Sequence, residues 1–134
     1  ARAAAVPLVL HVVHRHGAML KLLDAAGPAR GMVHAFAGPA ELVPAYVERG
    51  FFLSVGGAVT RPNARRVRAA VRAIPGERLL LETDAPDMTP TGVEGRNEPA
   101  HLTRVLAAVA EVRGEAPDAV AATTRGNARR LFGL

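Results

Sequence analysis

A short apolar run that ends in two carboxylates constrains the fold of this chain most strongly. Three leucines at 79–81 are followed by Glu82, Thr83 and Asp84, and Pro86 then ends the strand pattern. An apolar run with acids at its carboxyl end is typical of a buried parallel strand, and ligands gather at that edge of α/β folds. Alternation along a strand places Glu82 and Asp84 on one face. Asp84 is therefore the first candidate for chemistry, with a simple turn residue before Ala-Pro as the alternative.

Strand and helix patterns alternate along the whole chain. Strand patterns cover residues 6–13, 31–36, 51–55 and 79–84, and helical patterns cover 17–26, 39–49, 62–74, 99–113 and 117–132. Pro44 does not fit the second helix unless that helix starts late. The order predicts an α/β fold with a parallel sheet and right-handed crossovers, in a single domain over residues 1–134.

Composition limits the class of protein. The chain has 134 residues, of which 49% are hydrophobic and 22% charged, enough for one folded domain. It has no cysteine, which excludes disulfides and thiolate metal sites. No apolar run approaches the roughly 18 residues of a membrane span, so no membrane partner is expected. A net charge of +5 suits a polyanion such as nucleic acid, but the same charge also occurs without any such partner.

The predicted strand ends carry side chains that bind metal ions. His11 and His34 lie near the ends of the first two strands, and Asp84 follows the fourth. Because parallel strands end at one rim, these residues can converge there. Two imidazoles and a carboxylate suit Zn or Mn, although each histidine alone could be a packed core residue. His14 and His16 lie beyond the first strand and are expected in a loop or at a helix start.

Other motifs are absent or weaker. No phosphate loop, dinucleotide fingerprint or nucleophile elbow occurs, which argues against a serine nucleophile. Residues 85–95 are rich in Pro, Gly and Thr and are a candidate substrate-facing loop. The helix over 62–74 has an arginine face, for which solvation is the simpler explanation and nucleic-acid contact the alternative. That face consists of Arg65, Arg66, Arg68 and Arg72.

Five motifs follow one another in a recognisable order. They are Pro7-Leu-Val-Leu-His11, Gly31-Met-Val-His34-Ala-Phe36, Leu80-Leu-Glu-Thr-Asp84-Ala-Pro86, Arg96-Asn-Glu-Pro99 and Asn127-Ala-Arg-Arg-Leu-Phe-Gly-Leu134. In this order the chain resembles the TatD-like metal-dependent deoxyribonucleases over nearly its whole length. The family fold is a TIM-type (β/α) barrel of roughly 250 residues. The resemblance therefore implies the C-terminal portion of a barrel whose N-terminal strands are missing.

The resemblance also implies roles for particular residues. His11 and His34 correspond to metal ligands, and Asp84 to the catalytic, metal-binding aspartate. The implied substrate-binding residues are Glu82, Arg96, Asn97 and Glu98. The implied reaction is hydrolysis of DNA phosphodiesters by water activated on Mg, Mn or Zn, in the cytoplasm.

The chain also departs from the family pattern. Family members have an early His-x-His strand and a later metal-bridging glutamate, and neither occurs here. Val13 stands where members often place an arginine. We therefore expect the fragment itself to be inactive. Two alternatives stay open: a non-enzymatic truncated domain that binds nucleic acid or a partner chain, and a metal-dependent hydrolase of another ester or amide.

Overall fold

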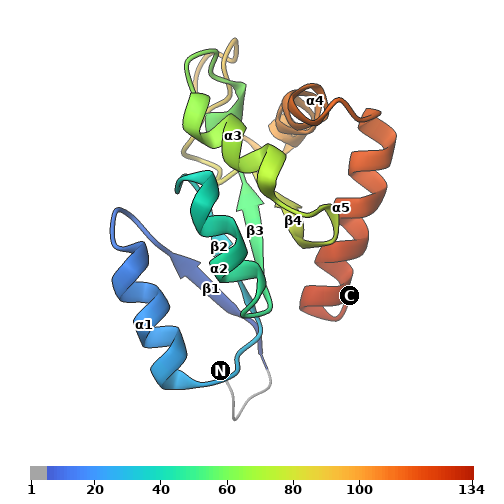
Figure 1. Ribbon diagram of the computed structural model, residues 1–134. Helices are drawn as coiled ribbons and strands as arrows, with labels where there is room; N and C mark the ends of the chain where they lie inside the picture. Colours follow the sequence, from blue (N-terminus) through green and yellow to red (C-terminus); the bar gives the residue numbers. More distant parts are fainter. Residues whose placement is uncertain (1–5) are drawn as a thin grey trace.

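Four parallel strands form one sheet in the order β1-β2-β3-β4 (Figure 1). The computed structural model describes residues 6–134. The strands are β1 Leu8–His11, β2 Gly31–His34, β3 Phe51–Val55 and β4 Leu79–Leu81. Each strand pairs in parallel with the next in sequence, so a crossover must separate every pair. The predicted α/β alternation and parallel sheet are confirmed.

Helices follow every strand. The α-helices are α1 His16–Ala26, α2 Val43–Val47, α3 Arg65–Ala73, α4 Leu102–Arg113 and α5 Pro117–Phe132. Short 3₁₀ turns occur as η1 Ala40–Leu42, η2 Gly57–Thr60, η3 Gly76–Arg78 and η4 Pro99–His101. Within residues 6–134, none of these helices combines the length and the apolar character that a bilayer crossing requires.

Several element boundaries differ from the predicted ones. The second helix does start late: η1 precedes α2, which places Pro44 in the first turn of α2, where a missing N–H costs nothing. Strand β2 stops at His34 because Ala35 has a left-handed φ of 46°. Strand β4 stops at Leu81, although the Glu82 N–H still donates to the Val55 carbonyl at 3.0 Å. Helix α3 begins at Arg65, later than residue 62.

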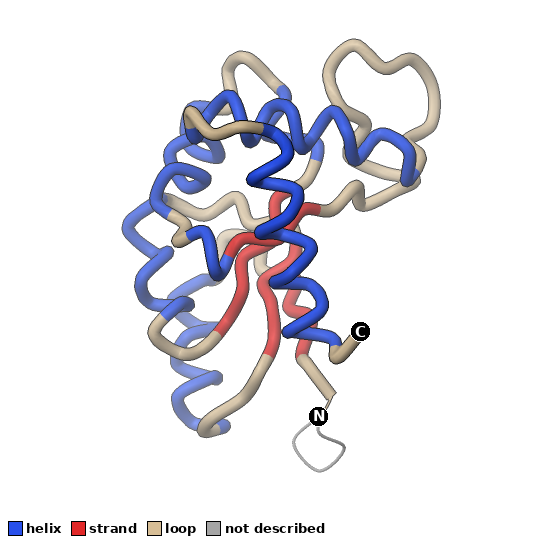
Figure 2. Tube along the Cα trace, turned by 90° about the vertical axis from the view of Figure 1, so that its right-hand side faces the viewer, coloured by secondary structure: helices blue, strands red, loops and turns tan. Residues whose placement is uncertain are grey.

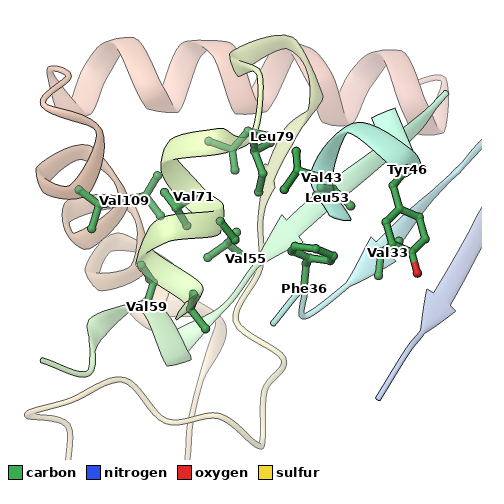
Figure 3. Packing of buried hydrophobic residues seen from close by; sticks show 14 of the residues in the cluster. Val33, Phe36, Val43, Tyr46, Leu53, Val55, Val59, Val71, Leu79 and Val109 are labelled. Atoms are coloured by element: carbon green, nitrogen blue, oxygen red, sulfur yellow. The ribbon is translucent and has the colours of Figure 1, made fainter. Parts of the chain in front are cut away.

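The main core lies between the sheet and the helices that follow its strands (Figure 3). Val33, Leu53 and Leu79 point from β2, β3 and β4 to this side and are at most 1% exposed. Tyr46 of α2 and Val71 of α3 are fully buried against them. These alternate strand residues pack the sheet against the helices, and the candidate site lies at the carboxyl ends of the same strands.

A second, smaller cluster covers the other face of the sheet. Met32, Phe52 and Leu80 point to this face, and Leu131 of α5 packs on them. Helix α5 crosses in front of the strands in Figure 2. Asn127 is 1% exposed, and its Nδ2 donates to the carbonyls of Gly76 at 2.7 Å and Leu79 at 2.8 Å. The side-chain amide thereby fixes α5 to the start of β4.

Candidate functional site

The carboxyl ends of the strands bring the predicted metal ligands to one rim. His11 and His34 are paired residues of β1 and β2, and their ring centroids are 5.6 Å apart. His34 Nε2 lies 3.5 Å from Asp84 Oδ1, beyond the end of β4. Residues separated by 73 positions in sequence therefore meet because parallel strands end on the same side of a sheet.

The spacing of His34 and Asp84 fits two ligands of one ion. Two ligand atoms at about 2.1 Å from a tetrahedral ion lie roughly 3.4 Å apart. The separation of 3.5 Å between His34 Nε2 and Asp84 Oδ1 is close to that value. However, no group of three or more His, Asp or Glu side chains within residues 6–134 is arranged to hold an ion. The described residues thus supply a candidate ligand pair, with the exposed His11 beside it, and do not complete a metal site.

Glu82 fixes the ring of His34. Its Oε1 lies 2.8 Å from His34 Nδ1 and accepts the backbone N–H of Ala35, also at 2.8 Å. An ionised carboxylate only accepts hydrogen bonds, so Nδ1 donates to Glu82, and Nε2 is the ring nitrogen that faces Asp84. A carboxylate that holds the far nitrogen of a metal-binding histidine is a common arrangement at metal sites.

This arrangement changes the interpretation of Glu82. The sequence predicts a substrate contact, but the side chain is 15% exposed and its Oε1 bonds to two protein groups. Asp84 has a left-handed φ of 58°, so the strand pattern does not continue to it. The two carboxylates instead approach opposite edges of the His34 ring, Glu82 at Nδ1 and Asp84 at Nε2.

Residues within three positions of the strand ends adopt left-handed backbone conformations. His14 has a φ of 55° after β1, and Ala35 has 46° after β2. Such a conformation is unfavourable for a residue with a Cβ, by roughly 1–2 kcal/mol. Strained residues of this kind concentrate at functional sites, where surrounding contacts hold them. Here the bond from the Ala35 N–H to Glu82 is one such contact.

Asn97 organises the loop that carries Asp84. Its side chain is 2% exposed, and Nδ2 donates to the carbonyls of Thr83 and Asp87. Its Oδ1 lies within hydrogen-bond distance of the Glu98 N–H and of His101 Nδ1. The amide is therefore fully occupied, which differs from the predicted substrate contact.

The other residues of this motif are more open. Arg96 and Glu98 are both exposed. Glu98 and His101 form a reciprocal capping box at the start of η4. The loop is held close to the sheet at Gly57, where a Cβ would lie 1.9 Å from the Met88 carbonyl oxygen. Gly57 therefore serves close backbone packing, whereas a Cβ at Gly56 would make only ordinary contacts at 3.5 Å or more.

Two features near the rim were not predicted. Ser54 is 1% exposed, and its Oγ has no hydrogen-bond partner among the described residues. A cleft of about 350 Å³ also opens beside His11 and His34, and His16 of α1 and Arg66 of α3 line its far side. The sequence does concentrate four of its five histidines within the first 34 residues. That clustering was the available signal for the cleft.

Comparisons with known proteins place these motifs in context. A family profile described as TatD related DNase matches residues 1–133. The 3'-5' ssDNA/RNA exonuclease TatD of Citrobacter koseri is 39% identical over 137 residues, covering 96% of this chain and 53% of the relative. The uncharacterized metal-dependent hydrolase YabD of Bacillus subtilis is 35% identical over 130 residues, covering 95% and 51%. This chain spans about half the length of the curated relatives it matches.

Solved structures agree with the sequence comparison. The crystal structure of YjjV, a TatD homologue from Escherichia coli K12, matches with a TM-score of 0.87 at 35% identity, covering 96% of this chain and 50% of that one. A TatD family hydrolase from Entamoeba histolytica has a TM-score of 0.82 at 18% identity, covering 98% and 52%, and supports the fold alone. The predicted fold class, a partial (β/α) barrel, is confirmed.

Proposed function

We propose that this chain, which belongs to the TatD related DNase family, carries part of the active centre of a metal-dependent nuclease. The observation that carries the proposal is the ligand-like pair of His34 and Asp84 at the strand rim, with Glu82 holding the His34 ring. A relative named a 3'-5' ssDNA/RNA exonuclease supports a single-stranded nucleic acid as substrate. The chain's charge of +5 suits such a polyanion.

The residues of this chain have distinct tasks in this proposal. His34 and Asp84 would hold a divalent ion, Mg, Mn or Zn, and His11 lies beside them at the same rim. When bound, such an ion supplies activation of water and neutralisation of phosphate charge. Glu82 keeps His34 Nε2 directed at the ion position, and Asn97 holds the loop on which Asp84 lies.

The chain corresponds, on this proposal, to the C-terminal portion of a barrel. Its described residues do not complete an ion site alone. We therefore expect the isolated 134-residue chain to hydrolyse nucleic acid poorly or not at all. A cytoplasmic location fits the lack of cysteine.

A matched pair of aspartate substitutions tests the proposal. Asp84→Asn and Asp87→Asn are compared in the natural polypeptide that contains this sequence, with labelled single-stranded DNA and Mg²⁺ or Mn²⁺. Asp87 is exposed in the same loop and makes only backbone contacts there, so it is the control. Loss of a metal-ligand carboxylate should lower turnover by roughly 100-fold or more, and the control should retain it.

Three results would contradict the proposal. Unchanged turnover in Asp84→Asn would remove Asp84 from the active centre. Hydrolysis of a simple phosphate ester or an amide, without any cleavage of DNA or RNA, would favour the alternative of a hydrolase with a different substrate. Binding of nucleic acid without cleavage under any metal would favour a non-enzymatic role.

A further inference from the structure

We propose that the cleft lined by His14, His16 and Arg66 binds a phosphate group of a nucleic-acid strand, next to the phosphodiester that is cleaved. This inference rests on the proposed function and adds a substrate subsite to it. The cleft has a volume of about 350 Å³, and His11 and His34 form its other side. A phosphate in it would therefore lie beside the candidate metal rim.

The charge of the cleft suits an anion. His14, His16 and Arg66 face it, and no lining residue in the described part of the chain is acidic. Both carboxylates of the rim, Glu82 and Asp84, contact the His34 ring and do not line the cleft. A strand phosphate could thus approach the metal rim from a side without carboxylate repulsion.

His16 is held in place by a hydrogen bond and by ring contacts. Its Nδ1 lies 2.9 Å from the hydroxyl of Tyr46, which is fully buried. In the ring tautomer that carries its proton on Nε2, the hydroxyl donates and Nδ1 accepts, which leaves the Nε2 proton for a ligand. Edge-on contacts with Phe36 and Tyr46, at centroid distances of 5.6 and 5.8 Å, fix the ring plane.

The protonation state of His16 agrees with this assignment. Burial, followed by electrostatic interactions with His14 and Arg66, lowers the pKa of His16 below its ordinary value. The ring therefore stays neutral at physiological pH and keeps one N–H to donate. A neutral donor next to a guanidinium is a combination that binds a phosphate oxygen.

Gly38 leaves the space that this arrangement needs. A Cβ at this position would lie 2.9 Å from His16 Nε2 and 2.9 Å from Phe36 Cζ. A side chain at residue 38 would therefore collide with the donor nitrogen or with the ring that supports it. Its lack of a side chain keeps Nε2 beside the cleft.

The position of Arg66 distinguishes a specific phosphate subsite from a generally basic surface. Arg65 and Arg66 are neighbours at the start of α3, and both are exposed. Arg66 lines the cleft, whereas Arg65 does not. If the arginine face were merely solvated, removing either charge would have the same effect on an anionic ligand.

The test compares these two arginines in the 134-residue chain. Binding of a fluorescent single-stranded oligonucleotide and of inorganic phosphate is titrated in EDTA at several salt concentrations, for Arg66→Gln and Arg65→Gln. Circular dichroism confirms that both variants fold. Arg66→Gln should weaken oligonucleotide binding roughly tenfold and lower the salt slope by about one, relative to Arg65→Gln. Gly38→Ala should weaken binding as well, while inorganic phosphate should perturb the His16 ring signals by NMR.

Three outcomes would overturn the inference. Equal losses in the two arginine variants would assign binding to the general charge of α3. Equal affinity for inorganic phosphate and for the oligonucleotide would assign the cleft to free phosphate. Absence of oligonucleotide binding would remove the subsite altogether. Because these measurements contain no metal and no turnover, they fail independently of the hydrolysis assay with Asp84→Asn.

Discussion

The contact between Glu82 and His34 gives the most direct quantitative prediction. Glu82→Ala removes the acceptor of two hydrogen bonds of 2.8 Å, from His34 Nδ1 and from the Ala35 N–H. Hydrogen bonds to a charged group contribute about 1.5–3 kcal/mol each. The side chain is 15% exposed, so water can replace part of this loss. We expect the free energy of unfolding to fall by about 2–4 kcal/mol.

The substitution should also change the His34 ring. Without Glu82, no carboxylate holds a proton on Nδ1, and the orientation that directs Nε2 towards Asp84 is lost. Loss of such an outer carboxylate typically lowers metal affinity by roughly 10–100-fold. Glu82→Gln, which keeps one acceptor oxygen but loses the charge, should show an intermediate effect on both properties.

Three measurements check this reasoning. Urea unfolding followed by circular dichroism gives the stability change, long-range ¹H–¹⁵N spectra give the His34 tautomer, and calorimetry gives the affinity for Mn²⁺ or Zn²⁺. Glu77→Ala is the control, because Glu77 is exposed just before the same strand. Unchanged stability together with an unchanged Nδ1–H tautomer in Glu82→Ala would refute the positioning role.

Three further predictions concern the loop, the core and pH. Asn97→Ala should lower the free energy of unfolding by about 2–3 kcal/mol, because it removes a buried amide and leaves the partly buried carbonyls of Thr83 and Asp87 without this donor. In the same urea titration, Arg96→Ala at an exposed position should change it by less than about 0.5 kcal/mol. Leu53→Ala should lower the free energy of unfolding by about 2–5 kcal/mol, because Leu53 is fully buried. A thermal melt should show little change in the melting temperature for Leu22→Ala, because Leu22 is 64% exposed. The pKa of His16 is lowered on folding, so the stability that its neutral ring contributes is complete above a pH of about 6.5 and is lost as the pH falls through the folded pKa. The free energy of unfolding should therefore decrease less between pH 7 and 5 in His16→Gln than in the unmodified chain.

Sequence periodicity was sufficient for the alternation of strands and helices and for the placement of His11, His34 and Asp84 at one rim. His11, His34 and Asp84 each follow an apolar run, and parallel strands place such positions on one rim whatever the details of the helices. The shared face of Glu82 and Asp84 was a less secure inference. It assumed that β4 continues to residue 84, whereas β4 ends at Leu81 and the left-handed φ of Asp84 departs from an extended backbone.

Contacts across elements were beyond the reach of sequence patterns. The family resemblance implied a substrate-binding role for Asn97, but the loop folds around its amide. The cleft at His16 depends on how α1, α2 and α3 pack, because Tyr46 and Arg66 come from different helices. No local spacing encodes that packing.

The attachment of α5 through Asn127 has a consequence for how the chain is made. The Leu79 carbonyl receives a side-chain donor from a residue 48 positions further along, and Leu131 covers the apolar surface of Leu80. A ribosome exposes β4 well before it releases either of these residues. Until synthesis passes residue 131, the apolar face of the sheet at Leu80 stays uncovered and can contact other nascent polypeptides. The last turns of α5 thus protect this face only after they have left the ribosome.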